Sequence, residues 1–374
     1  MKNNRRDFVK KSSALAAFSL VGMRSGPSGI FGVPESSEKD SGMDDKWRFS
    51  RPLMKLSFQA SPEPSEDDIR FLQQMGIEYV VLWCDADKAG YDYYYSRRQL
   101  FKSAGIKILG FGNWAVHNQD KIVLNLPGRD EKIEEYQAHI RNLGRAGINY
   151  TTYAHMGNGI WSTARETTRG GAPARAFNLE KADAGTWIGR RFEGPLTHGR
   201  KYTEDELWKN YEYFIRAVVP VAEESGVFIG IHPDDPPAVE LGGIPRCIFS
   251  SFDGYKRALE IADSPNVGIC LCVGCWLEGG ELMGRDVIET IKYFGKRNKI
   301  FKVHFRNVDK PLPHFVETFL DNGYADMYMI LEALKDVDFS GPIISDHVPG
   351  MVHRHANSAF TIGYMKALIE RVYS

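Results

Sequence analysis

The 374-residue sequence has few cysteines and no long apolar run. Its five cysteines are too few and too unevenly spaced for a disulfide framework: Cys84, Cys247, Cys270, Cys272 and Cys275. No apolar stretch approaches the ~20 residues that a membrane-spanning helix needs. The formal net charge is −1 and basic blocks are short, so we expect neither a nucleic-acid partner nor an anionic membrane surface.

What is present fits one large soluble domain. Hydrophobic residues make up 43% and charged residues 25% of the chain, an ordinary balance for a globular protein. The length suits a single α/β barrel with insertions, which we place at residues 49–374. A homo-oligomer is compatible with this composition.

The first 48 residues have a different character. Arg5-Arg6 precedes a short, weakly apolar stretch over residues 13–23, which resembles a twin-arginine export signal. A basic amphipathic tail is the alternative. Residues 26–45 are rich in Gly, Ser and Pro and indicate a flexible linker. We therefore expect export, to the periplasm, or a cytoplasmic protein if the signal does not function.

The remaining chain alternates between two kinds of segment. Short apolar runs bounded by Gly, Pro or acidic residues predict buried parallel strands at residues 53–58, 79–83, 106–111, 148–153, 227–231, 267–271, 300–303 and 342–345. Helices are predicted after them at residues 65–75, 93–104, 130–146, 203–225, 252–262, 286–297, 325–334 and 358–372. This alternation is typical of a (β/α)8 TIM barrel. A doubly wound open sheet is the alternative.

Residues 157–202 break the alternation with a long Gly-, Arg- and Thr-rich insertion. A connection of this length inside a compact fold is usually a functional loop or lid.

Metal-binding side chains follow four successive predicted strands in the last half of the chain: His232, Cys272, His304 and Asp346. The carboxyl ends of barrel strands lie at one face, where barrel enzymes carry their chemistry. We therefore predict a shared divalent metal site. Neutral imidazole, thiolate and carboxylate suit Mn²⁺, Fe²⁺ or Zn²⁺ better than Mg²⁺ or Ca²⁺.

The cysteines near Cys272 allow another interpretation. Cys270, Cys272 and Cys275 have the C-x-C-x-x-C spacing of a zinc knuckle. Strand alternation places Cys270 on the same face as Cys272 but one layer deeper, and no second pair follows at zinc-ribbon spacing. We therefore predict that Cys270 is a buried core residue.

Polar residues beside two of the metal-binding positions are candidates for substrate chemistry. Arg306 offers a planar fork that suits a carboxylate, and a salt bridge to a neighbouring helix is its alternative. Asn307 can donate to a hydroxyl. His347, next to Asp346, suits general acid–base work near neutral pH.

Short motifs follow one another in the last half of the chain: His232-Pro233-Asp234-Asp235-Pro236-Pro237, Cys272-Val273-Gly274, His304-Phe305-Arg306-Asn307, Phe315-Val316-Glu317-Thr318, Asp326-Met327 and Asp346-His347. Together they resemble the mannonate dehydratase family of the hexuronate pathway, closely over residues 208–364 and loosely over 53–202. The resemblance implies a xylose-isomerase-like TIM barrel that removes water from D-mannonate to give 2-keto-3-deoxy-D-gluconate. It also implies Mn²⁺ or Fe²⁺ at the four metal positions, acid–base roles for His347 and Tyr364, and a sugar pocket shaped near Trp161.

The sequence departs from the family pattern at three places. Asp-His-Gly is Asp346-His347-Val348 here, and the usual histidine after the glutamate is absent near Leu320. The Trp-Thr-Arg-Thr segment is only echoed by residues 161–165. Two other functions stay open at this point: a sugar isomerase or epimerase, with Glu317 and Asp326 as its carboxylates, and a non-catalytic exported protein that binds a sugar acid.

Overall fold

The structure is a computed structural model that describes residues 53–353 and 355–374. The predicted export signal and linker, residues 1–48, lie outside the described residues. The apolar runs and amphipathic segments of the sequence form the elements that they predict. Within the described residues, no helix is both long and apolar enough to cross a membrane.

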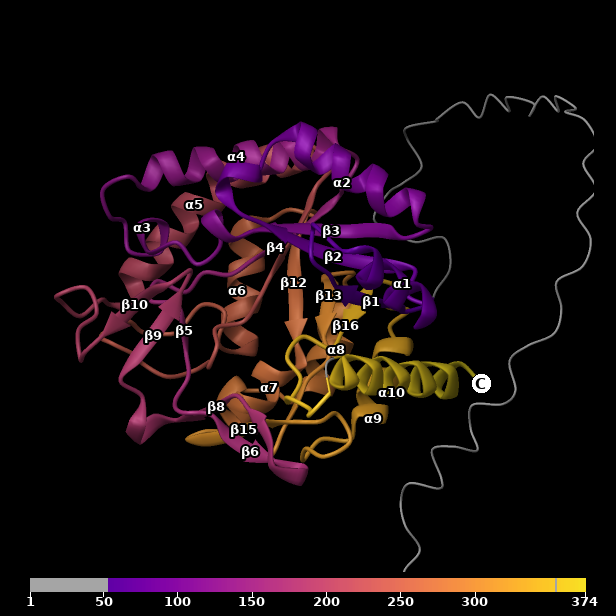
Figure 1. Cartoon of the computed structure of the whole chain (residues 1–374). Coiled ribbons are helices and arrows are strands. Elements are labelled where there is room, and N and C mark those ends of the chain that lie inside the picture. Colours follow the sequence, from indigo (N-terminus) through magenta and orange to yellow (C-terminus); the bar gives the residue numbers. More distant parts are fainter. Residues whose placement is uncertain (1–52, 354) are drawn as a thin grey trace, which may run out of the picture. The chain divides into compact units, whose positions relative to one another are not determined.

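Eight parallel strands form the centre of the molecule (Figure 1). In sheet order they are β3 (Lys107–Asn113), β2 (Tyr79–Cys84), β1 (Lys55–Gln59), β16 (Pro342–Ile344), β13 (Ile300–His304), β12 (Val267–Cys272), β11 (Phe228–Ile231) and β4 (Tyr150–Tyr153). Each hydrogen-bonded neighbour is parallel. The predicted TIM barrel is confirmed.

The two ends of this sheet, β3 and β4, approach each other at a glycine. A Cβ at Gly110 on β3 would overlap the ring of Tyr150 on β4 and crowd its carbonyl oxygen. Only a residue without a side chain lets the two backbones come this close. The Tyr150 ring therefore fills the space that closes the barrel.

The helices that alternate with the strands also match the prediction. They are α1 (Glu66–Gln74), α2 (Tyr91–Ser103), α4 (Arg129–Arg145), α5 (Glu204–Glu224), α6 (Phe252–Ala262), α8 (Val287–Gly295), α9 (Met327–Lys335) and α10 (Ala356–Tyr373), with the shorter α3 (Asp120–Val123) and α7 (Val273–Gly279). Ser65 and Thr203 begin α1 and α5 with capping boxes, which satisfy backbone donors at both helix starts.

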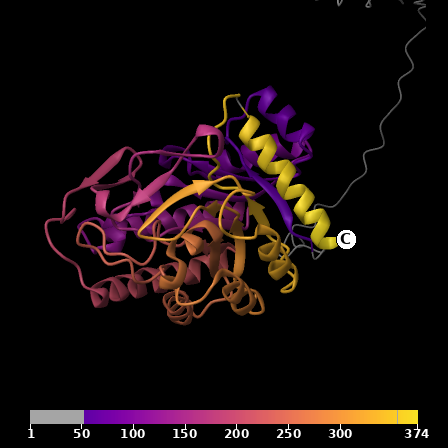
Figure 2. The same cartoon turned by 90° about the horizontal axis from the view of Figure 1, so that it is seen from below.

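The last helix packs against the first βα unit, so the two ends of the described chain meet. Figure 2 shows α10, in yellow, alongside the indigo segments. The ring of His355 stacks on Phe71 of α1 with centroids 5.1 Å apart, and the Met54 amide donates to the Tyr373 hydroxyl at 3.3 Å.

The insertion at residues 157–202 is built from short strands rather than a structureless loop. They are β5 (Ile160–Trp161), β6 (Glu166–Thr168), β7 (Ala172–Ala174), β8 (Ala176–Asn178), β9 (Ala184–Trp187) and β10 (Arg190–Glu193). Two further strands, β14 (Asn307–Val308) and β15 (His314–Thr318), follow β13, and β8 pairs antiparallel with β15. The insertion thereby joins the connection that follows His304 (Figure 1).

A buried histidine, His139, links α4 to α2 and β4. His139 is 1% exposed, with Nδ1 2.7 Å from the Tyr94 hydroxyl and Nε2 3.0 Å from Thr151 Oγ1. Burial lowers the pKa of His139 to about 3. The ring is therefore neutral in the folded chain at neutral pH.

This histidine predicts a loss of stability in mild acid. An unfolded histidine has a pKa of ~6.5, so below that pH the unfolded chain binds a proton that the folded chain excludes. The contribution of His139 to the free energy of unfolding is complete above pH ~6.5 and is lost as the pH falls toward 3. Between pH 7 and pH 5 we expect His139 to lower the free energy of unfolding by about 2 kcal/mol, measured by urea denaturation.

The control variant is His139→Gln, which keeps polar contacts to Tyr94 and Thr151 and does not titrate. His155, whose pKa burial also lowers to about 3, is present in both proteins and cancels. Equal losses in the variant and the parent between the two pH values would contradict the assignment.

Candidate metal centre and active site

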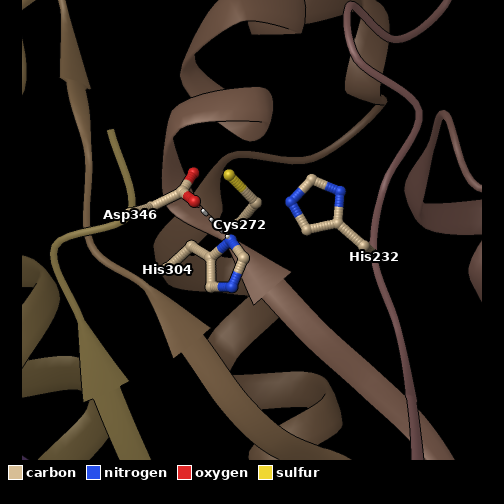
Figure 3. A group of neighbouring side chains, drawn as sticks. All are labelled: His232, Cys272, His304 and Asp346. Carbon is tan, nitrogen blue, oxygen red and sulfur yellow. Dashed lines mark ion pairs between the residues drawn. The ribbon is translucent and has the colours of Figure 1, made fainter. Parts of the chain in front are cut away.

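The four metal-binding side chains predicted from the sequence converge at the carboxyl ends of the strands. One donor atom from each of His232, Cys272, His304 and Asp346 lies within 4.8 Å of all the others. Figure 3 shows the four side chains grouped at the strand ends. Cys272 and His304 end β12 and β13 and are register partners. His232 follows β11 directly, and its amide donates to the Tyr153 carbonyl at 2.7 Å.

The two imidazoles are oriented for binding a cation. His232 Nδ1 lies 2.7 Å from the Pro233 carbonyl oxygen, which can only accept a hydrogen bond, so Nδ1 carries the proton and Nε2 keeps its lone pair. Neither ring nitrogen of His304 has a hydrogen-bond partner, although Nδ1 lies 3.3 Å from Asp346 Oδ1. Buried nitrogens without a hydrogen-bond partner, beside a thiol and a carboxylate, are suited to bind a metal ion.

The two anionic members are held in their charged forms. Burial opposes ionisation of Cys272, but the Cys275 thiol and the Arg306 guanidinium outweigh it and lower the pKa of Cys272 well below its usual range. Burial also opposes ionisation of Asp346, and His304 and His347 lower its pKa. Asp346 has a left-handed backbone (φ 57°), a strained geometry that concentrates at functional sites.

The donor set therefore fits a transition ion. Two imidazoles, a thiolate and a carboxylate match Mn²⁺, Fe²⁺ or Zn²⁺ in softness, whereas Mg²⁺ and Ca²⁺ prefer oxygen. The zinc-knuckle alternative does not form, because Cys270 is register-paired with Lys302 one layer below. Cys270 is fully buried, as predicted.

A second cluster of acidic side chains lies beside the first, but its members are already paired with arginine side chains. Donor atoms of Asp235, Cys275 and Glu278 also lie within 4.8 Å of one another. Arg306 Nη2 lies 3.2 Å from Cys275 Sγ and 2.9 Å from Glu278 Oε1, and Arg175 Nη2 lies 2.5 Å from Asp235 Oδ1. This group is a buried ion-pair network.

Arg306 is not open to a substrate. Its side chain is 0% exposed, and Nη1 donates to Glu317 Oε1 at 2.7 Å. Nη2 contacts Glu278 on α7, so the contacts match the salt-bridge alternative rather than the predicted carboxylate clamp. A Cβ at Gly274 would overlap Nε of Arg306, which explains the glycine between Cys272 and Cys275.

The other two predicted substrate residues, Asn307 and Trp161, are both buried. Asn307 donates to the carbonyls of Leu320 and Ala325 at 3.1 and 2.9 Å, and thus shapes the connection after β14. Trp161 lies on β5; its carbonyl accepts a hydrogen bond from Arg175 at 2.9 Å, and its Nε1 has no hydrogen-bond partner. A substrate contact for either residue stays a prediction.

The two predicted proton-transfer residues lie in different settings. His347 has a 42% exposed side chain beside Asp346, and its Nδ1 lies 2.9 Å from Glu317 Oε1. Partial desolvation of the ring opposes the charge of His347, but Asp346 and Glu317 outweigh it and raise its pKa to about 9. Tyr364 lies on α10, where its ring stacks on Phe360 at 6.3 Å. Among the described residues no recorded contact joins Tyr364 to His347.

Sequence reasoning missed residues that surround the centre. Arg175 lies in the insertion and Asp235 in the motif that follows His232, and neither is among the predicted site residues. A ring cluster next to His232 was also missed: Trp83, Trp114, His117 and Trp187. His117 Nδ1 and Trp187 Nε1 are buried without a hydrogen-bond partner. Trp83 is the next-to-last residue of β2, and Trp114 and His117 lie within four residues of the end of β3, positions that could have signalled the site.

Comparison with known proteins identifies the family. The family model described as D-mannonate dehydratase (UxuA) matches residues 70–186 and 189–374. The chain belongs to this family. A mannonate dehydratase of Streptococcus equi subsp. zooepidemicus is 34% identical over 270 residues, covering 67% of this chain and 72% of the relative. One from Oceanobacillus iheyensis is 34% identical over 255 residues, covering 61% and 69%. As a family member the chain is a hydro-lyase.

Solved structures support this family assignment. The mannonate dehydratase of Streptococcus suis serotype 2 superposes with a TM-score of 0.73 at 28% identity, covering 86% of this chain and 93% of that one. A 3-keto-D-glucoside 4-epimerase from E. coli gives a TM-score of 0.55 at 13% identity, covering 84% and 98%. The second likeness concerns the xylose-isomerase-like barrel alone.

The convergence of four donors predicts a single high-affinity metal ion per chain. We expect Cys272→Ala to weaken metal binding by more than about 100-fold. Replacing a residue that only hydrogen-bonds a metal-binding side chain typically weakens it by about 10- to 100-fold. Elemental analysis of the purified chain, followed by chelator competition, measures this. Cys247→Ala, a half-buried cysteine outside the centre, is the control. Equal ion content in both variants would contradict the assignment.

Proposed function

We propose that the chain removes water from D-mannonate, giving 2-keto-3-deoxy-D-gluconate, at a metal centre held by His232, Cys272, His304 and Asp346. The proposal rests on the convergence of these donors at the barrel face where the strands end, in a member of the D-mannonate dehydratase family. Mn²⁺ or Fe²⁺ is the proposed ion, because the donor set mixes nitrogen, sulfur and oxygen.

The reaction makes two demands on the residues around the centre. A proton must leave the carbon next to the substrate carboxylate, and the departing hydroxide must receive a proton. A bound divalent ion supplies electrostatic stabilisation of the negative charge that develops on the carboxylate. The remaining chemistry is proton transfer at a fixed position, which this chain's own side chains must provide.

His347 is the proposed proton-transfer residue. Its Nδ1 lies 2.9 Å from Glu317 Oε1, to which a protonated Nδ1 donates, and 2.8 Å from Arg306 Nη1. Nε2 is the nitrogen left to meet a substrate, and the side chain is open enough to do so. Tyr364 stays a prediction as the second group, since its recorded contacts are with Phe360 and the apolar core.

The deciding assay incubates the metal-loaded chain with D-mannonate and follows formation of a 2-keto acid. We expect His347→Asn to keep its metal content while turnover falls by about 100-fold or more, because the acid–base group is lost. His314→Asn, which removes a histidine paired with Glu166 in the insertion, is the matched control. Unchanged turnover in His347→Asn would remove this residue from the mechanism, and absence of keto acid from the parent chain would overturn the function.

We also propose that the chain is exported by the twin-arginine route, on the strength of Arg5-Arg6 and the weakly apolar stretch after them. This route carries folded proteins, so the metal centre with its reduced thiolate is assembled before transport. We expect Arg5→Lys with Arg6→Lys to retain the protein in the cytoplasm of a bacterium with this pathway. Cell fractionation measures it, and identical periplasmic amounts for parent and variant would exclude the route.

A further inference from the structure

The side chain of Arg175, in the insertion, contacts Glu317 beside His347. We propose that Arg175 is a positioning residue that fixes Glu317, which in turn fixes the ring of His347 beside the metal centre. The insertion at residues 157–202 then completes the active site, rather than only covering it. The activity readout of this inference rests on the proposed function, whereas its structural readout does not.

The backbone brings Arg175 to Glu317. Arg175 stands between β7 and β8, and β8 pairs antiparallel with β15, the strand that carries Glu317. The Glu317 amide donates to the Arg175 carbonyl at 2.9 Å. Main-chain hydrogen bonds thus hold the two residues side by side, independently of the contact between their side chains.

The guanidinium of Arg175 then binds several parts of the chain at once. Nη1 donates to Glu317 Oε1 at 3.0 Å, and Nη2 donates to Asp235 Oδ1 at 2.5 Å. Within the insertion, Nη2 also donates to the Trp161 carbonyl at 2.9 Å and Nε to Ser162 Oγ at 2.8 Å. Asp235 lies in the loop after β11 and Glu317 lies on β15. The planar guanidinium of Arg175 therefore connects these two segments.

Three side-chain nitrogens surround a single oxygen of Glu317. Oε1 accepts from Arg306 Nη1 at 2.7 Å and from Arg175 Nη1 at 3.0 Å, and lies 2.9 Å from His347 Nδ1. With two guanidiniums on this oxygen the carboxylate cannot rotate freely. The imidazole that it holds therefore keeps Nε2 in one direction, which a proton-transfer residue requires.

Lysine at position 175 separates positioning from folding. The ammonium keeps the positive charge that the carboxylates need, so no buried carboxylate loses its counter-charge. It is a point charge without a fork, so it cannot hold Glu317 and Asp235 in the arrangement seen here. A purely structural arginine would leave turnover largely unchanged in a folded, metal-loaded Arg175→Lys protein.

The experiment compares Arg175→Lys with Arg169→Lys in the metal-loaded full chain. Arg169 is also in the insertion and also makes a two-point ion pair, with Asp321 at 2.6 and 3.1 Å, away from the network. We expect Arg175→Lys to lower kcat by about 10- to 100-fold with little change in KM. Arg169→Lys should keep both constants. Equal effects of the two variants, or a change confined to KM, would overturn the proposal.

Two further measurements separate this inference from the proposed function. In a background of Glu317→Gln, Arg175→Lys should have a much smaller effect on kcat, because both changes act through the same contact; additive effects would overturn the proposal. ¹⁵N NMR of the imidazole nitrogens in Zn²⁺-loaded protein should show a shift of His347 in Arg175→Lys but not in Arg169→Lys, with His347→Asn for assignment. That result does not depend on D-mannonate being the substrate. An unchanged His347 signal in Arg175→Lys would contradict the proposal that Arg175 positions His347.

Discussion

The guanidinium of Arg306 is the buried charge around which the active site is arranged. It lies below the metal-binding residues with no exposure, 3.5 Å from Cys272 Sγ and 3.2 Å from Cys275 Sγ. A cation so placed favours the thiolate form of Cys272, the form that binds a metal. The same cation must itself be neutralised, because an uncompensated buried charge is strongly destabilising.

The carboxylates around Arg306 and Arg175 complete this neutralisation. Burial raises the pKa of Asp235, but the two guanidiniums outweigh it and bring the pKa to about 2. Burial and the neighbouring Asp235 raise the pKa of Glu278 well above its usual range. Against burial, the same two guanidiniums and His347 lower the pKa of Glu317. Removing any member would leave a charge without its partner.

The sequence predicted the barrel and the convergence of the metal-binding residues because both follow from simple periodicities. Apolar runs of fixed length specify strands, and a residue at the carboxyl end of each strand must lie at one face. The short strands of the insertion, two to four residues each, carry too few positions for any period to be visible. Arg175 and Asp235 are 60 positions apart, so no local pattern connects them.

The residues beside the metal centre were harder still, because their chemistry is ambiguous. A planar fork such as Arg306 binds a substrate carboxylate and a protein carboxylate equally well, and only the positions of Glu278 and Glu317 decide between them. Asn307 offers the same choice between a hydroxyl and backbone carbonyls. Spacing along the chain specified which strand end each residue occupies, but not which partner crosses from another element.

The barrel alone does not select the reaction. Epimerases with TM-scores of 0.55 and 0.53 share it at 13% and 11% identity, so the scaffold is common to different chemistries. At the strand ends of this chain, the Cys272 thiol lies beside Arg306 and the His347 ring beside Glu317. Both contacts belong to one ion-pair network, and Arg175 of the insertion contributes its second guanidinium. The surroundings of the metal-binding residues therefore depend on charges outside the barrel strands as well as on those at their ends.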